Sequence, residues 1–190
     1  MTPTDVAAHF DRRYADDPDP WGASTRWYER RKRDLALAAL GREHYGRVFE
    51  PGCGSGAMTA ALAPRCDHLL ALDVAARAVE ATRARTASLP QVRVCRGTIP
   101  ADWPTGSLDL VVLSEVAYYL EPEAVRRVAG LIAAALAPGG ELLAVHWRGR
   151  ADDLRLSAAA AHEALASAGG LDLQVALVDP RFLLATWRRR

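Results

Sequence analysis

The sequence predicts a doubly wound α/β fold. Its sheet has seven strands, mostly parallel, with a C-terminal antiparallel hairpin and a helical extension before the first strand. From residue 48 onward, short apolar segments alternate with segments of helical periodicity, as expected of parallel strands joined by crossover helices. The last two apolar segments are joined only by Asp179-Pro180, which cannot hold a crossover helix. These two strands must therefore be antiparallel.

The first 45 residues differ in pattern from the rest of the chain. We expect residues 1–45 to form an N-terminal helical cap or lid, and residues 46–190 to form the main domain. A short helix is predicted from Asp5 to Tyr14, and two prolines forbid a helix in the stretch that follows. Ser24 or Thr25 is expected to cap a second helix, which runs to about Leu40 and stops near Gly41.

The main domain is predicted as strands and helices in turn. The strands are expected over residues 47–50, 68–73, 92–95, 108–113, 141–146, 173–178 and 182–187. The helices are expected over residues 57–63, 75–87, 121–137 and 158–168. The fourth strand is almost entirely apolar, which is typical of a central parallel strand. The helix after it begins with proline and acid, and Pro138-Gly139-Gly140 is expected to end it.

Size and composition favour one domain without a metal. The chain has 190 residues, 50% of them hydrophobic, and a formal net charge of +1. That charge gives no general attraction to nucleic acid or to anionic membranes. The three cysteines and five histidines have no zinc-binding spacing, and neither a signal peptide nor a membrane-spanning run is visible. We expect a cytoplasmic monomer or homodimer that binds neither nucleic acid nor membrane.

The glycine-rich segment Glu50-Pro51-Gly52-Cys53-Gly54-Ser55-Gly56 follows the first strand and opens a helix. Glycines permit a sharp turn and close approach of a ligand, and the free amides of the helix start offer donors. The segment also fits the dinucleotide-binding pattern. However, the Glu50 carboxylate would attract a cationic amine and would not help a pyrophosphate. The lack of a second domain for a dehydrogenase substrate, together with the terminal hairpin, also argues against a dinucleotide.

Asp73 ends the second predicted strand, 21 residues after Gly52. A carboxylate at this position suits the two hydroxyls of a ribose. The alternative is that Asp73 caps the next helix, which would begin at Val74. The combined spacing of the glycine loop and the acid favours ribose binding.

Over about residues 45–190 the sequence resembles the class I methyltransferases that depend on S-adenosylmethionine (SAM), whose sheet is Rossmann-like. The resemblance rests on the glycine loop, on Asp73 and on Leu136-Ala137-Pro138-Gly139-Gly140. It implies SAM as the methyl donor, S-adenosylhomocysteine (SAH) as the product, and no metal.

A closer resemblance, to the nodulation protein S (NodS) family, covers nearly the whole chain. Members of that family methylate the free amine of a deacetylated chitooligosaccharide. The resemblance therefore implies an N-methyltransferase whose acceptor is an amine of a small molecule, such as an amino sugar. It rests on Asp17-Pro18-Asp19-Pro20-Trp21, Tyr28-Glu29-Arg30-Arg31-Lys32, Leu62-Ala63-Pro64-Arg65-Cys66-Asp67, Trp103-Pro104, Ser114-Glu115-Val116-Ala117-Tyr118-Tyr119-Leu120 and Val145-His146-Trp147.

Cofactor contacts are expected from the N-terminal extension and from the strand ends. Trp21 and Tyr28 are candidates for an aromatic lid over the cationic sulfonium, and Lys32 for a partner of the methionine carboxylate. Many class I enzymes bind the adenine amine with an aspartate after the third strand, where this chain has Thr98. Thr98 offers one hydrogen bond; alternatively, backbone groups bind adenine and Ile99 packs on the ring. The full expected set is Trp21, Tyr28, Lys32, Glu50, Gly52, Cys53, Gly54, Asp73, Val74, Thr98, Ile99 and Ser114.

The methyl acceptor is expected beyond the fourth and fifth strands. An amine must be neutral to attack, so Glu115 and His146 are candidate catalytic bases. Tyr118, Tyr119 and Trp147 offer stacking faces to a sugar-like acceptor. The alternatives are structural: a hydrogen-bonded histidine at a strand end, and tyrosines that pack in the core.

Other functions share parts of this pattern. A small-molecule O-methyltransferase would have the same fold and donor. A non-catalytic nucleotide-binding module or an NAD-dependent reductase would use the same glycine loop. A nucleic-acid methyltransferase is disfavoured by the near-neutral charge and by Ser114-Glu115-Val116-Ala117, which lacks the Asn/Asp-Pro-Pro-aromatic loop.

Overall fold

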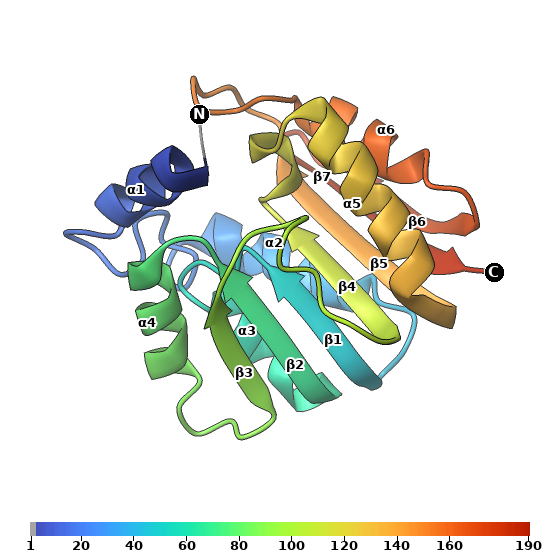
Figure 1. Ribbon diagram of the computed structural model, residues 1–190, viewed down its shortest axis with the longest axis horizontal. Helices are drawn as coiled ribbons and strands as arrows, with labels where there is room; N and C mark the ends of the chain where they lie inside the picture. Colours follow the sequence, from blue (N-terminus) through green and yellow to red (C-terminus); the bar gives the residue numbers. More distant parts are fainter. Residues whose placement is uncertain (1–2) are drawn as a thin grey trace.

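The computed structural model describes residues 3–190, so residues 1–2 of the predicted cap lie outside the described residues. Seven strands form one sheet in the order β3-β2-β1-β4-β5-β7-β6 (Figure 1). The first five strands pair in parallel, whereas β7 pairs antiparallel with both β5 and β6. The predicted fold class is confirmed. The strands are β1 Tyr45–Pro51, β2 Cys66–Asp73, β3 Val92–Arg96, β4 Leu108–Ser114, β5 Leu136–Trp147, β6 Leu171–Val178 and β7 Phe182–Arg189.

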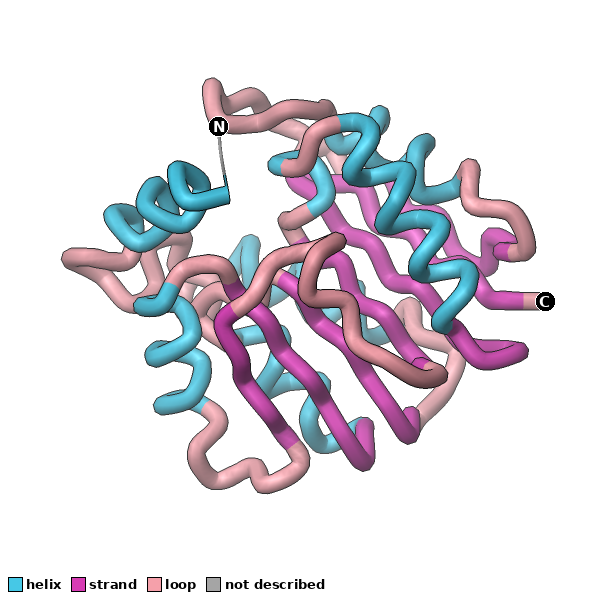
Figure 2. Tube along the Cα trace, in the orientation of Figure 1, coloured by secondary structure: helices cyan, strands magenta, loops and turns pink. Residues whose placement is uncertain are grey.

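Helices cover both faces of the sheet (Figure 2). Residues of α2, α3 and α4 pack in one buried cluster with one face of the strands, and residues of α5 and α6 pack in another cluster with the opposite face. The first helix, α1, lies near the carboxyl ends of the parallel strands and packs against the start of α4. The helices are α1 Pro3–Arg13, α2 Trp27–Ala38, α3 Ala57–Leu62, α4 Ala76–Arg85, α5 Pro122–Ala135 and α6 Ala158–Ala166.

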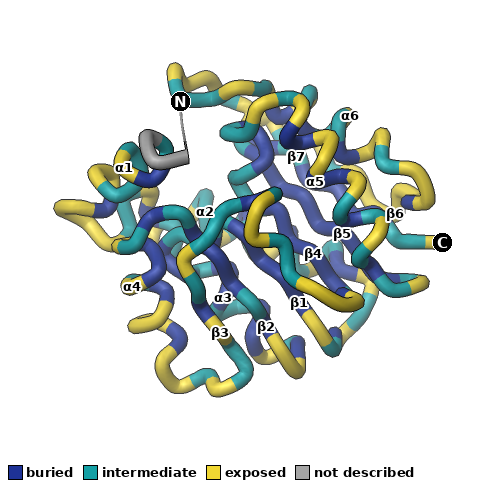
Figure 3. The backbone as a smooth tube through the Cα atoms, viewed as in Figure 1, coloured by how far each residue is buried: buried dark blue, intermediate teal, exposed yellow. Residues whose placement is uncertain are grey.

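The central strand β4 shows why the sheet has two cores (Figure 3). Leu110, Val111, Val112 and Leu113 are all completely buried. Because side chains alternate across a strand, Leu110 and Val112 join the cluster that contains α2 to α4, whereas Val111 and Leu113 join the cluster that contains α5 and α6. This two-sided burial explains the uninterrupted apolar run that predicted a central strand.

The start of α2 differs from the prediction. Its N-cap is Arg26, without a side-chain cap, so the expected capping by Ser24 or Thr25 is wrong. The Asp19 carboxylate instead accepts hydrogen bonds from the backbone amides of Ala23 at 2.8 Å and Ser24 at 2.9 Å. An aspartate in the preceding turn therefore satisfies these backbone donors, and the helix begins later in the chain.

The start of β5 also differs from the prediction. Helix α5 ends at Ala135, and β5 begins at Leu136, so Pro138-Gly139-Gly140 lies inside the strand and does not end the helix. Leu136 pairs with Leu108 of β4, and the register shifts before the next pair. Gly139 has φ +74°, which a bulge of this kind accommodates. The glycines therefore mark an irregularity in the strand.

The loops between the parallel strands position the candidate site. No helix separates β3 from β4; the connecting loop covers that part of the sheet with Trp103, whose ring lies 5.0 Å from that of Phe49. The loops after β1, β2, β4 and β5 all reach the carboxyl edge of the sheet, because these strands are parallel.

Among residues 3–190, no helix is both long and apolar enough to cross a membrane.

Candidate active site

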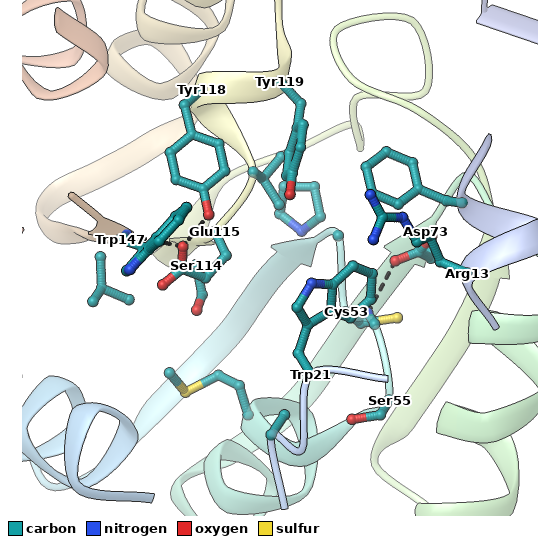
Figure 4. A pocket seen from close by; sticks show the side chains of 18 of the residues that line it. Arg13, Trp21, Cys53, Ser55, Asp73, Ser114, Glu115, Tyr118, Tyr119 and Trp147 are labelled. Carbon is teal, nitrogen blue, oxygen red and sulfur yellow. Dashed lines mark hydrogen bonds between the residues drawn. The ribbon is translucent and has the colours of Figure 1, made fainter. Parts of the chain in front are cut away.

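A cavity of about 530 Å³ lies at the carboxyl edge of the sheet (Figure 4). This size is ordinary for a site that encloses a small molecule. Residues of α1, α2 and the loops after β1 to β5 line it. All predicted site residues line this cavity except His146; they are Trp21, Tyr28, Lys32, Glu50, Gly52, Cys53, Gly54, Asp73, Val74, Thr98, Ile99, Ser114, Glu115, Tyr118, Tyr119 and Trp147.

The glycine loop is held tightly against its neighbours. The amides of Gly52 and Cys53 both donate to the carbonyl of Leu72, at 2.6 and 2.9 Å. Gly52 has φ +75°, and a Cβ at this position would lie 2.1 Å from a methyl carbon of Val116. A side chain is therefore excluded here both by backbone conformation and by space. The close approach of Val116 to Gly52 holds the glycine loop against the loop that follows β4.

Glu50 presents a buried carboxylate to the cavity. Its side chain is 2% exposed, and Oε2 has no hydrogen-bond partner among the described residues. Burial raises the pKa of Glu50 to about 8; the neighbouring Thr59 side chain opposes this shift, and the Asp73 carboxylate acts in the same direction as burial. A buried polar atom without a partner is costly, so this carboxyl group, on a residue that lines the cavity, is a candidate to receive a donor from a ligand. The geometry thus suits a cationic amine.

Asp73 binds the backbone with both carboxylate oxygens. Oδ2 accepts from the amide of Gly54 and Oδ1 from the amide of Ala75, each at 2.9 Å. The second bond closes a turn just before α4, whose N-cap is Ala75 and has no side-chain cap, so the capping role that the sequence left open is not seen. Burial raises the pKa of Asp73, although these backbone donors lower it. Because a carboxylate has about four acceptor positions, Asp73 retains capacity for ribose hydroxyls.

The loop after β3 offers an apolar surface. The amide of Thr98 donates to Asp102 Oδ2, and its carbonyl accepts from the amide of Asp102, both at 2.8 Å. These groups therefore close a turn and are not free for adenine. Ile99 is 5% exposed and lines the cavity. A hydrogen bond from the Thr98 hydroxyl to adenine and packing of Ile99 on the ring both stay predictions.

Lys32 has two acidic partners within the chain. Its Nζ lies 2.5 Å from Glu115 Oε1 and 2.8 Å from Glu29 Oε2. Although burial lowers the pKa of Lys32, the two carboxylates raise it above its ordinary value. Lys32 is thus a buried cation between two acids. Two acids hold the ammonium group, which has a third donor, and the expected pairing with a methionine carboxylate stays a prediction.

Glu115 is held on three sides. Besides Lys32, it accepts hydrogen bonds from the hydroxyl of Tyr118 and, at 2.9 Å, from the backbone amide of Trp147. Its backbone has φ +59°, a conformation uncommon outside glycine. Figure 4 shows Glu115, Tyr118 and Trp147 together on one side of the cavity, away from Asp73. The carboxylate is therefore fixed in the part of the cavity where the sequence analysis expected the acceptor.

His146 does not line the cavity, contrary to the prediction that it contacts the acceptor. It is completely buried; Nε2 accepts from the amide of Ala117 at 3.0 Å, and Nδ1 lies 3.1 Å from His162 Nε2. Burial lowers the pKa of His146 well below its ordinary value, and His162 and Lys32 act in the same direction. Successive side chains of a strand point to opposite faces of the sheet, so His146 points into the core while Trp147 faces the cavity.

Aromatic rings from both halves of the chain enclose the cavity. Phe10 of α1 meets Tyr119 at 5.0 Å between ring centroids, and Trp21 meets Tyr14 at 5.5 Å. Tyr28 instead supports the guanidinium of Arg181, which lies 3.7 Å from its ring centroid. Trp21 lines the cavity beside Tyr14, whereas Tyr28 packs beneath Arg181, and the aromatic lid stays a prediction.

Several residues at the cavity were not predicted from the sequence. Arg13 and Asp153 come from distant parts of the chain, and His9 Nε2 meets Asp153 Oδ2 at 3.0 Å. No sequence pattern around either residue predicts such a pair. Asp19 could have been found: it lies in a turn-rich segment, and aspartates there commonly bind backbone amides. Among residues 3–190, no cluster of three or more His, Cys, Asp or Glu side chains could hold a metal ion.

Comparison with known proteins gives the family. The family model described as nodulation protein S (NodS) matches residues 2–150. The chain belongs to the NodS family. Nodulation protein S of Rhizobium tropici is 33% identical over 127 residues, which cover 66% of this chain and 53% of that protein. The chain thus spans about half the length of the curated NodS proteins it matches.

Solved structures give the same fold. The N-methyltransferase NodS from Bradyrhizobium japonicum WM9, in complex with SAH, matches with a TM-score of 0.85 and 27% identity, over 97% of this chain and 98% of that chain. A protein from Pseudomonas syringae, proposed to be a methyltransferase, matches with a TM-score of 0.77 and 44% identity, over 86% of this chain and all of that chain. The NodS-family chain therefore has the Rossmann-like fold of class I methyltransferases.

Proposed function

We propose that this chain transfers a methyl group from SAM to an amine of a small molecule, in the class of amino sugars or short chitooligosaccharide-like molecules. Membership of the NodS family and the SAH complex of the N-methyltransferase from Bradyrhizobium japonicum support the proposal. The observation on which it chiefly rests is the buried carboxyl group of Glu50, a residue that lines the cavity and whose Oε2 has no hydrogen-bond partner among the described residues. A cationic amine favours the charged form of this carboxyl group and donates to it, whereas a pyrophosphate brings no positive charge to it.

The residues of the donor side fit an adenosyl amino acid. Glu50 is assigned to the α-amine, Asp73 to the ribose hydroxyls and Ile99 to a face of adenine. When bound, SAM supplies a sulfonium methyl that is already a strong electrophile. The task of the protein is therefore to align the acceptor with the methyl group and to exclude water. The closely packed glycine loop lets the donor approach the backbone without steric conflict.

The acceptor side has the groups that an amine requires. Glu115 is assigned to hold the acceptor amine and to take up its proton, since a protonated amine cannot attack. The Lys32 ammonium and the Tyr118 hydroxyl fix this carboxylate in place. An amine that binds Glu115 does so beside Lys32 and shares the carboxylate with it. Trp147 and Tyr119 are assigned to stack against the acceptor body.

The N-terminal segment is assigned to close the cavity. Helix α1 is tied to the loop after β5 by His9 and Arg13, whose side chains lie 3.0 and 3.8 Å from Asp153 Oδ2. These contacts bridge the two walls of the cavity. In our proposal residues 1–45 act as a cap that excludes water from the methyl group during transfer.

Titration calorimetry with SAM, SAH and NAD tests the donor. We expect binding of SAM and SAH and none of NAD; NAD binding without a SAM signal would overturn the proposal. Labelled SAM with a panel of amino sugars, deacetylated chitooligosaccharides and phenols then tests the acceptor.

We expect label on amines only. Label on hydroxyl groups alone would instead establish O-methylation. The Glu115→Gln variant should bind SAM normally and transfer about a hundredfold more slowly, the lower end of the range for loss of a general base. Transfer at the wild-type rate would remove Glu115 from the mechanism.

A further inference from the structure

A pair of buried histidines lies behind the acceptor side of the cavity. His146 of β5 and His162 of α6 are in hydrogen-bond contact at 3.1 Å, and their rings meet edge to face with centroids 5.1 Å apart. Neither residue lines the cavity. The His162 ring in turn rests on Trp187 of β7, with centroids 5.9 Å apart. The pair joins α6 to the sheet at the level of the proposed acceptor site.

The contacts of His146 determine which of its nitrogens holds the proton. Nε2 faces the backbone amide of Ala117, which can only donate, so Nε2 must be the unprotonated acceptor. The ring proton therefore lies on Nδ1 and is donated to His162 Nε2. This tautomer leaves no further ring position on His146 that could exchange a proton with a substrate.

The bond from Ala117 supports the proposed acceptor site directly. Ala117 is completely buried and begins the one-turn helix Ala117–Tyr119. This turn includes Tyr118, whose hydroxyl donates to Glu115, and the Tyr118 ring also packs edge to face on His146 at 5.0 Å. The residue after His146, Trp147, donates its amide to the same Glu115 carboxylate. One histidine thus fixes both the turn and the strand end that orient Glu115.

Every element packed against His146 bears on its charge. His162 of α6 and Lys32 of α2 both disfavour a positive charge on the ring. Glu115 and Tyr118 belong to the loop after β4, but Glu115 is already neutralised by Lys32. Protonation of Nε2 would place a cation in the core and would turn the acceptor of the Ala117 amide into a second donor. The turn would then lose its anchor.

We propose that His146 is a positioning residue: held in its Nδ1-protonated form by His162, it accepts from the Ala117 amide and thereby sets the loop that orients Glu115 and Tyr118 toward the acceptor. This inference rests on the proposed methyl transfer to an amine and deepens it. His146 itself touches neither substrate nor donor. Its loss disturbs acceptor binding and turnover and leaves SAM affinity unchanged.

Two variants at one position separate the hydrogen bond from the packing. His146→Phe keeps a ring of similar size but removes the acceptor, whereas the side-chain carbonyl of His146→Gln can occupy the place of Nε2. The matched control is His44→Gln, an exposed histidine before β1 that bonds only Asp67. For His146→Phe we expect kcat/KM for the acceptor to fall about tenfold or more, the scale of one lost buried hydrogen bond, with SAM affinity unchanged. His146→Gln should recover most of this loss.

Structural measurements on the wild-type protein test the inference without turnover. Nitrogen-15 spectra should show the Nδ1–H tautomer of His146 at neutral pH. Hydrogen exchange at the Ala117 amide should be slow in the wild type and in His146→Gln, and fast in His146→Phe. Activity should also fall at acidic pH together with the loss of protection at Ala117, and the His44→Gln control should behave as the wild type.

The Nε2–H tautomer, or equal protection of Ala117 in the wild type and in a folded His146→Phe variant, would overturn the positioning role. Equal loss of kcat/KM in the Phe and Gln variants would do the same, because it would reduce His146 to core packing. If the wild type methylates no acceptor, the proposed function fails, and the tautomer and exchange measurements still decide whether His146 anchors the loop.

Discussion

Replacing Glu50 by glutamine tests the donor site, because it removes the proton that we expect Glu50 to release when SAM binds. The Glu50 carboxyl is buried, lacks a partner for Oε2 among the described residues, and has its pKa raised to about 8. At pH 6.5 most of the ligand-free protein therefore holds this proton. An ammonium group that binds Oε2 favours the charged carboxylate, so the proton must leave when SAM binds.

The same ionisation sets the pH dependence of affinity. Well below the pKa of about 8, the affinity of the wild type for SAM should rise about tenfold per pH unit, because each binding event releases close to one proton. Glu50→Gln has no proton to release, so its affinity between pH 5.5 and 7 should be flat. It should also be lower near pH 7, by roughly 1.5–3 kcal/mol, which is the worth of a hydrogen bond to a charged group.

Calorimetry in buffers of different ionisation enthalpy counts the released protons. We expect close to one proton per SAM for the wild type at pH 6.5, and close to none for Glu50→Gln. Glu141→Gln is a matched control: Glu141 is also buried, but its hydrogen bonds to Tyr45, Gly41 and Arg188 lower its pKa despite burial, and it does not line the cavity. A wild type and Glu50→Gln with the same proton count and the same pH slope would refute the assignment of Glu50 to the amine.

Four further substitutions test other parts of the structure. Asp73→Ala should weaken SAM binding by about 1–3 kcal/mol, as for loss of a buried acceptor, and calorimetry that finds unchanged affinity would exclude the ribose contact. Gly52→Ala should destabilise the fold by roughly 1–3 kcal/mol in denaturant unfolding, because a Cβ there meets Val116 at 2.1 Å with φ +75°, whereas Gly130→Ala, with open space in α5, should stabilise it by about 0.5–1 kcal/mol. Burial lowers the pKa of His162 to about 4, below its unfolded value of 6.5, so its contribution to stability is present above pH 6.5 and lost as pH falls toward 4; His162→Phe should therefore show a smaller drop in melting temperature between pH 7 and 4.5, and an unchanged drop would contradict this.

The acceptor side shows where local pattern stops being informative. The segment Ser114 to Tyr119 indicated a functional loop, and Glu115 does line the cavity. Its partner Lys32, however, lies 83 residues away in the chain, and no spacing rule links the two. His146 failed as a cavity residue because the alternation of β5 turns its ring into the core, which a conspicuous His-Trp pair at a strand end does not reveal.

The amino-acid order alone determined the strands, most of the helices, the antiparallel hairpin, the glycine turn after β1 and the acid at the end of β2. These features follow from side-chain periodicity and backbone freedom, which act over a few residues. Only the packed structure decided that β5 begins before its glycines, that Lys32 binds Glu115 and Glu29, and that His146 accepts a hydrogen bond from the Ala117 amide. Each of these depends on which groups are buried opposite one another, and burial is a property of the assembled sheet and helices.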